Sequence, residues 1–93
     1  VHVPGEEEDR ESSYWLMTVT CDDRDELRAL LAKHGIATGM AHFRNDISPV
    51  FGTKKLVLQG MDAVEDSYVC LPIHMGVTED DVEKICTILN DRY

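Results

Sequence analysis

A short apolar run followed by a capped helix and a glycine is the feature that most constrains how this chain folds. The run YWLMTVT, residues 14–20, is rich in aromatic and β-branched side chains, which suit a buried strand. Asp22 and Asp23 can accept hydrogen bonds from a first helical turn, and Gly35 can adopt the left-handed conformation that ends many helices. One face between them carries Leu27, Leu30 and Leu31, with His34 next on the same stripe. The spacing therefore predicts a strand and then a helix over 23–34.

The clearest helix signal lies near the C-terminal end. Thr78 is followed three residues later by Asp81, the pattern of a capping box, and we predict a helix over 79–90. Its apolar face comprises Val82, Ile85, Cys86 and Leu89. The preceding run CLPIH, residues 70–74, contains Pro72, which cannot donate to a β-ladder. We therefore expect an edge strand or an extended connection there.

The middle of the chain gives weaker signals. Residues 36–43 are typical of a second strand, although Gly39 interrupts it, and residues 53–60 are ambiguous between strand and helix. Residues 61–69 have the spacing of a short helix. The expected fold class is a two-layer α/β domain, with a sheet of about three strands packed against two to three helices.

Length and charge narrow the classes of function. The 93 residues suffice for one domain, which we place at 13–93 after an acidic, mobile arm at 1–12. A formal net charge of −9 argues against a nucleic-acid partner, because such proteins gather Lys and Arg on one face. The sequence has neither an apolar run long enough for a membrane span nor a basic, apolar signal peptide. We expect no membrane partner and a cytoplasmic location.

Cysteine and histidine spacing predicts neither a disulfide nor a metal site. The three cysteines form no CxxC pair, and each lies in or beside an apolar segment, at Cys21, Cys70 and Cys86. We expect them to act as small core side chains. No two potential ligands stand at the spacing of a closed zinc site, and no nucleophile elbow or phosphate-binding glycine loop is present.

A cluster of polar side chains follows the expected strand at 36–43. His42, Arg44, Asn45 and Asp46 place four hydrogen-bonding groups within five positions, where a loop on a rigid scaffold often binds ligands. Asn and Asp are also good turn formers, and Arg44 with Asp46 would make an ordinary solvated pair. The residues alone leave the two interpretations open.

Three segments together resemble a known family. The order of YWLMTV, DDRDELRALLAKHGIATGMAHFRNDISPVFG and DAVEDSYVCLPIHMGVTEDDVEKICTIL is similar to the C-terminal part of the DegT/DnrJ/StrS sugar aminotransferases. The resemblance covers about Ser13 to Tyr93. It implies the C-terminal domain of an aspartate-aminotransferase-type fold, in a homodimer that uses pyridoxal phosphate to aminate a keto group on a nucleotide-linked sugar.

The resemblance also implies that catalysis needs a domain absent from this chain. In the family the Schiff-base lysine and the groups that bind pyridoxal phosphate belong to a large domain. The lysines here match no such motif; they are Lys33, Lys54, Lys55 and Lys84. We therefore expect the 93 residues to be inactive alone, with no catalytic or cofactor-binding residue among them.

The expected role of this domain is to contribute part of the sugar-nucleotide site. His42 and Phe43 match a histidine and an aromatic residue that approach the ligand in the family, whereas Ile47 replaces a second histidine of many members. Arg44 is chemically suited to hold a phosphate or carboxylate through two hydrogen bonds. His74 matches the phrase LPIH, which is as much a structural junction as a site. The alternatives are a stand-alone module that binds a small metabolite and a structural interaction domain.

Overall fold

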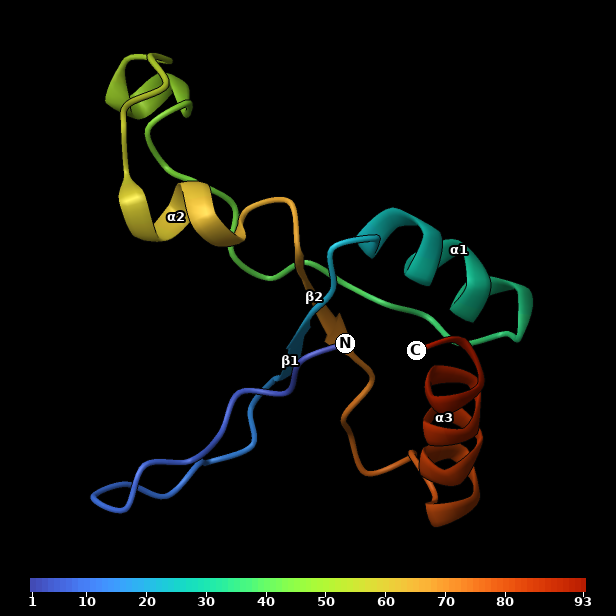
Figure 1. Cartoon of the computed structure of the whole chain (residues 1–93). Helices are drawn as coiled ribbons and strands as arrows, with labels where there is room; N and C mark the ends of the chain where they lie inside the picture. Colours follow the sequence, from blue (N-terminus) through green and yellow to red (C-terminus); the bar gives the residue numbers. More distant parts are fainter.

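A short pair of antiparallel strands lies at the centre of the fold (Figure 1). The computed structural model describes all 93 residues. Strand β1 (Met17–Thr20) pairs with β2 (Tyr68–Leu71), and Val19 stands opposite Val69 in the ladder. Both valines are fully buried, so one face of this small sheet forms the base of the core.

Single backbone bridges widen the sheet on both sides. His2 pairs with Thr20 on the outer side of β1, and Gly39 pairs with Cys70 on the outer side of β2. The Gly39 N–H donates to the Cys70 carbonyl at 3.0 Å, and the Cys70 N–H donates back at 2.8 Å. The small α/β domain was predicted correctly, but its sheet has two strands rather than about three.

The predicted strand over 36–43 is wrong, because the segment pairs with the sheet only at Gly39. Three residues later the backbone of His42 bonds to a side chain instead of a strand. Its N–H donates to the Tyr68 hydroxyl at 3.1 Å, and that hydroxyl donates to the His42 carbonyl. A tyrosine side chain thus replaces the next step of the ladder and directs the segment away from the sheet.

Two helices cover the same face of the sheet. Helices α1 (Arg24–Lys33) and α3 (Glu79–Arg92) confirm the two predicted helices. With the strands they enclose a core of seven buried residues: Val19, Cys21, Leu27, Leu31, Val69, Leu71 and Ile85. The predicted capping box of α3 is present, since the Asp81 N–H donates to Thr78 Oγ1 at 3.2 Å and the Thr78 N–H donates to Asp81 Oδ2 at 2.9 Å.

Element boundaries shift where the backbone or a proline requires it. Strand β1 starts at Met17 rather than Tyr14, because Tyr14 has a φ of 52°, which is incompatible with extended backbone. Strand β2 begins at Tyr68 and ends directly before Pro72. The short helix expected over 61–69 is α2 (Gln59–Val64).

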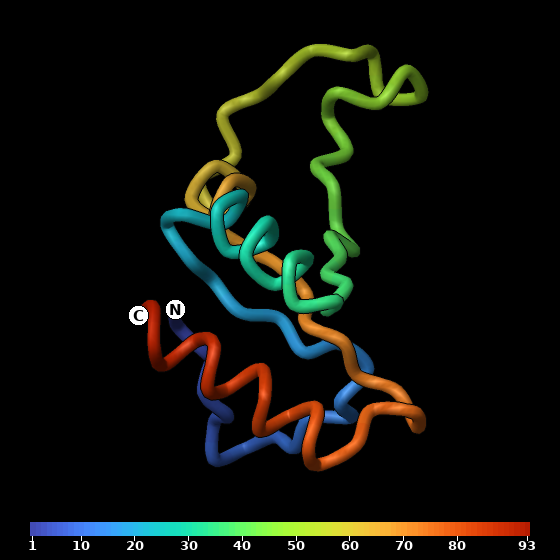
Figure 2. The backbone as a smooth tube through the Cα atoms, turned by 90° about the vertical axis from the view of Figure 1, so that its right-hand side faces the viewer, coloured from blue at the N-terminus to red at the C-terminus, as the bar shows by residue number.

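Two long excursions leave the sheet (Figures 1 and 2). The segment 43–58, here named the projecting loop, runs outward through the 3-10 helix Pro49–Phe51 and returns to α2. The N-terminal arm is exposed throughout residues 1–15 and turns back to β1. These excursions give the molecule principal extents of 45 × 36 × 24 Å. The mobility of the arm stays a prediction.

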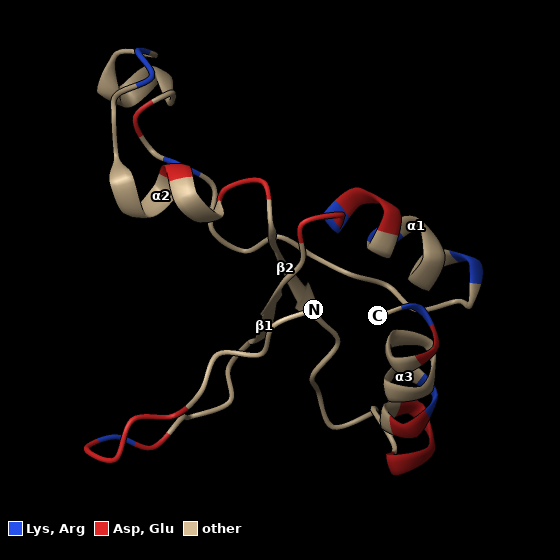
Figure 3. Cartoon of the chain, in the orientation of Figure 1, with Lys and Arg blue, Asp and Glu red and all other residues tan.

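Charge and cysteine placement complete the description. Figure 3 shows acidic residues along the arm and at the first turns of α1 and α3. All three cysteines are free; Cys21 and Cys70 are buried as predicted, whereas Cys86 is exposed on α3. None of the helices has the length and apolar character needed to cross a membrane.

Candidate functional site

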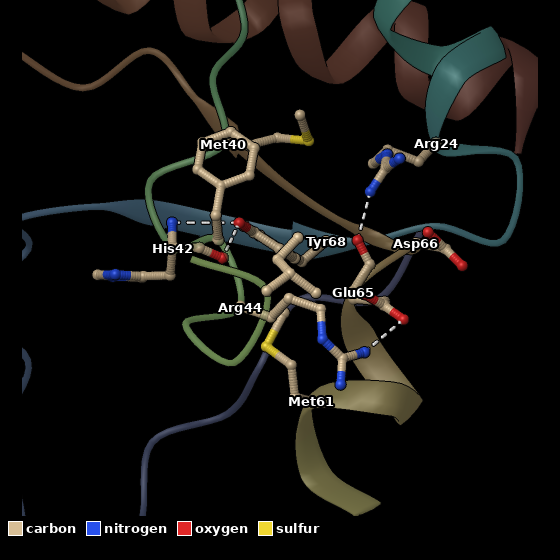
Figure 4. A pocket seen from close by; sticks show the side chains of 10 residues that line it. Arg24, Met40, His42, Arg44, Met61, Glu65, Asp66 and Tyr68 are labelled. Carbon is tan, nitrogen blue, oxygen red and sulfur yellow. Dashed lines mark hydrogen bonds and ion pairs between the residues drawn. The ribbon is translucent and has the colours of Figure 1, made fainter. Parts of the chain in front are cut away.

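The candidate site begins at His42, whose backbone is held by Tyr68, the first residue of β2. The Tyr68 hydroxyl both accepts from the His42 N–H and donates to the His42 carbonyl, which satisfies two polar groups with one side chain. The His42 side chain is free of these bonds. Figure 4 shows its imidazole pointing away from Arg44 and Met61. The sheet therefore holds the backbone of His42 in place and leaves the ring accessible.

The ring of His42 meets a second aromatic side chain. The ring centroids of His42 and Trp15 lie 5.9 Å apart with an angle of 68° between the planes, an edge-to-face arrangement. Both residues are exposed. Trp15 could not be predicted as a neighbour of His42 from the sequence, because it lies 27 positions earlier in the chain. Only the folded chain brings the two rings together.

Arg44 points the other way and is buried. Its guanidinium donates through Nε and Nη2 to the two carboxylate oxygens of Asp46, both at 2.7 Å. Nη1 donates to Asp62 at 2.8 Å and to Glu65 at 2.9 Å, and Nη2 also donates to the Leu56 carbonyl at 2.9 Å. All five N–H groups of the guanidinium are thus engaged within the chain.

This arginine cluster links the projecting loop to α2. Asp46 accepts a further bond from the Leu56 N–H at 2.7 Å, so its carboxylate bridges both ends of the loop. The side chains of Arg44 and Asp46 are each only 4% exposed, so the solvated pair considered from sequence is in fact a buried pair. Its partners Asp62 and Glu65 lie on or just after α2, where local sequence gives no sign that they meet Arg44.

The cluster shifts the protonation of its members. Hydrogen bonds from Arg44 hold the pKa of the Asp46 carboxyl well below its usual range, with a further contribution from the Leu56 N–H. The same contact with Asp46 raises the pKa of Arg44. Lys55, which lies 2.8 Å from the Glu65 carboxylate, lowers the pKa of Glu65 together with Arg44. All these groups are charged at neutral pH.

A hollow of about 220 Å³ lies between His42, Arg44 and Tyr68 (Figure 4). Its lining residues come from the start of α1, from the segment after Gly39, from α2 and the turn after it, and from β2: Arg24, Met40, His42, Phe43, Arg44, Ile47, Met61, Glu65, Asp66 and Tyr68. Half of these ten residues are hydrophobic and half are polar or charged. A mixed lining of this kind suits a ligand with both hydroxyl groups and carbon faces.

Comparison with known proteins identifies the chain. The model of the DegT/DnrJ/EryC1/StrS aminotransferase family matches residues 1–90. The chain belongs to this family. The resemblance described from the sequence is thereby confirmed. No curated protein matches the chain.

Solved structures agree with this family assignment. The chain is similar to the sugar aminotransferase CalS13 from Micromonospora echinospora, with a TM-score of 0.88 and 27% identity. It is equally similar to AtS13 from Actinomadura melliaura, with a TM-score of 0.88 and 28% identity. In both cases the match covers 99% of this chain and 25% of the other. This chain therefore spans about a quarter of the length of these structures.

Not every predicted site residue of this DegT-family chain lies at the hollow. His42 and Arg44 line it, whereas Asp46 lies behind it as the partner of Arg44. Asn45 is exposed, and its carbonyl accepts from the Ser48 N–H at 3.0 Å as part of a turn. His74 lies beyond β2 beside α3, where its Nδ1 accepts from the Gly76 N–H at 3.0 Å.

The four lysines of this DegT-family chain lie away from the hollow. None of them lines the hollow, and all four are exposed: Lys33, Lys54, Lys55 and Lys84. Lys55 is paired with Glu65, and Lys84 donates to the His34 carbonyl at 2.8 Å. No lysine therefore contributes to the lining of the hollow. No group of three or more metal-binding side chains is present either.

Proposed function

We propose that this chain is the C-terminal domain of a pyridoxal-phosphate-dependent aminotransferase that acts on a nucleotide-linked keto sugar. The family match over residues 1–90 carries the proposal, because it assigns nearly the whole chain to the aminotransferase family. The similarity to CalS13, which is named as a sugar aminotransferase, supports a sugar as substrate. The catalytic lysine and the cofactor then belong to a large domain outside these residues.

Within that enzyme, the residues that line the hollow, His42 among them, form one side of the sugar-nucleotide site. His42 is the residue we place against the ligand, because its backbone is fixed by Tyr68 while its imidazole has no other hydrogen-bond partner in the chain. An imidazole can donate to or accept from a sugar hydroxyl or a phosphate. Asn45 offers a second exposed polar side chain three residues after His42.

For Arg44 and Asp46 we propose an indirect contribution. All five guanidinium N–H groups already have partners, so a phosphate would have to displace a carboxylate from Arg44. The pair instead holds the projecting loop in the shape that forms this wall. His74 stays a prediction with an engaged Nδ1 and no contact with the hollow.

The exposed apolar side chains of the projecting loop fit a domain within a larger protein. Val50, Phe51 and Val57 are 84%, 68% and 89% exposed, respectively. Such side chains gain by being covered. In the proposed enzyme they lie against the large cofactor-binding domain, and a homodimer remains part of the proposal.

Kinetics of the natural full-length protein test this function. A panel of nucleotide-linked keto sugars is incubated with the protein, pyridoxal phosphate and amino-acid donors, and amine products are followed by mass spectrometry. We expect amination, and we expect His42→Ala to raise KM about tenfold through the loss of one hydrogen bond to the ligand.

His34→Ala is the matched control, because His34 is an exposed histidine at the end of α1 and its imidazole does not line the hollow. It should leave KM unchanged. Turnover of other keto compounds without turnover of any nucleotide-linked sugar would refute the proposed substrate class. An unchanged KM in His42→Ala would refute the assigned role of His42.

A further inference from the structure

A large aromatic side chain stands exposed beside the candidate site. Trp15 is 73% exposed, although tryptophan is among the side chains that gain most from burial. Its only aromatic partner is the ring of His42, met edge to face. Trp15 does not itself line the hollow, but it contacts His42, which does.

Trp15 lies between a hydrogen-bonded turn at Tyr14 and the start of β1 at Met17. The residue after it begins the approach to β1, and Tyr14 before it adopts a φ of 52°, a conformation that is uncommon for a bulky residue. This turn is held by bonds from the Tyr14 N–H to Ser12 Oγ at 3.1 Å and from the Tyr14 hydroxyl to Glu6 at 3.3 Å. The indole is thus presented from a shaped turn rather than from a free end.

The acidic arm that precedes Trp15 limits which chemical groups can bind to the indole. The arm that precedes it carries one guanidinium, Arg10, which is paired with Asp9, and four further carboxylates at Glu6, Glu7, Glu8 and Glu11, so its charge is net negative. Phosphate groups are repelled by such a surface, whereas an uncharged ring is not. The open indole therefore suits a flat, neutral ring of a ligand whose other end carries the charge.

We propose that Trp15 is a stacking platform for the nucleobase of the ligand, next to the contact that His42 makes. This inference rests on the proposed function, because it requires a nucleotide-linked substrate. Aromatic side chains stack on any base, since every base has a π-face. The platform thus contributes affinity for the nucleotide part without choosing among bases.

Binding of nucleotides to the natural full-length protein tests the platform. UDP, dTDP, GDP and ADP are titrated by calorimetry and by tryptophan fluorescence, with glucose 1-phosphate as a ligand that lacks a base and a nucleotide-linked sugar in parallel. Trp15 is the only tryptophan among the 93 residues, and the Trp15→Phe variant isolates its signal in a longer chain. We expect each nucleotide to quench that signal and Trp15→Ala to weaken nucleotide binding about 5- to 150-fold.

Two further variants make the result specific. Trp15→Phe keeps an aromatic face and should retain part of the affinity. Tyr93→Ala is the matched control, because Tyr93 is also an exposed aromatic residue, at 44%, but lies at the C-terminal end of α3 (Figure 1). It should bind nucleotides as the wild type does. Circular dichroism confirms that each variant is folded.

The outcomes separate this inference from the proposed function. Wild-type affinity in Trp15→Ala, together with weakened binding in His42→Ala, would overturn the platform and leave the proposed function standing. Equal quenching by glucose 1-phosphate would overturn the assignment to the base. If neither a nucleotide nor a nucleotide-linked sugar binds to the wild type, the proposed function fails and the platform fails with it.

Discussion

Replacing Tyr68 by phenylalanine removes the hydroxyl that fixes His42 and keeps the rest of the side chain. Tyr68 is 7% exposed, so the phenyl ring continues to fill its place in the core. The hydroxyl makes two bonds to one backbone residue, with the His42 N–H at 3.1 Å and with the His42 carbonyl. The substitution therefore isolates the contribution of these two contacts.

The expected cost follows from the number of bonds lost. Each intramolecular hydrogen bond contributes about 0.5–1.5 kcal/mol net, so Tyr68→Phe should lower the free energy of unfolding by about 1–3 kcal/mol. A domain of this size has a total stability of roughly 5–14 kcal/mol, so the loss is readily measured. Each kcal/mol lost should lower Tm by about 4–8 °C.

Urea unfolding of the 93-residue chain, followed by circular dichroism, measures this cost. Tyr14→Phe is the matched control, because the Tyr14 hydroxyl bonds only to Glu6 at 3.3 Å and the side chain is 60% exposed. We expect a change of less than about 0.5 kcal/mol for the control. Amide spectra should show the resonance of His42 moving in Tyr68→Phe and staying in place in Tyr14→Phe. Equal stability of the two variants would refute the view that the hydroxyl anchors the segment.

Two other predictions concern the arginine cluster and the cap of α3. The pKa of Asp46 is held below its ordinary value of 3.8 by Arg44, so the stability from this pair is complete above that pH and declines as pH falls below it; urea titrations at successive pH values should show a shallower acid loss in Asp46→Asn than in the wild type. An identical acid loss would contradict this. Thr78→Ala removes the capping box of α3 and should cost about 1 kcal/mol, whereas Thr87→Ala within the same helix should cost nothing; equal costs in thermal unfolding would count against the cap.

The helices could be predicted because their signals are local. The capping box at Thr78 and Asp81 involves neighbours in sequence, and Gly35, with a φ of 75°, follows α1 as its spacing indicated. The extended segments depend on partners far along the chain. The bridge between Gly39 and Cys70 joins residues that are 31 positions apart. Neither segment alone could therefore show that residues 36–43 pair with the sheet only at Gly39.

The site was predicted only in part, because several of its contacts join residues that are far apart in the sequence. His42 was selected through the family resemblance, and the structure places it at the hollow. The burial of Arg44 could not be predicted, because two of its partners, Asp62 and Glu65, are 18 and 21 positions later. Trp15 was missed since its meeting with His42 depends on the order of the strands.

The basic side chains around the hollow are not free to bind a negatively charged ligand. Arg44 is fully engaged, Lys55 is paired with Glu65, and Arg24 donates to the Glu65 carbonyl at 2.6 Å. Every basic side chain near the hollow is therefore already used within the chain, and the net charge is −9. A nucleotide diphosphate carries negative charge that requires positive partners. If the proposed function is right, the ligand finds these partners outside the 93 residues, beside the contacts that we propose for His42 and Trp15.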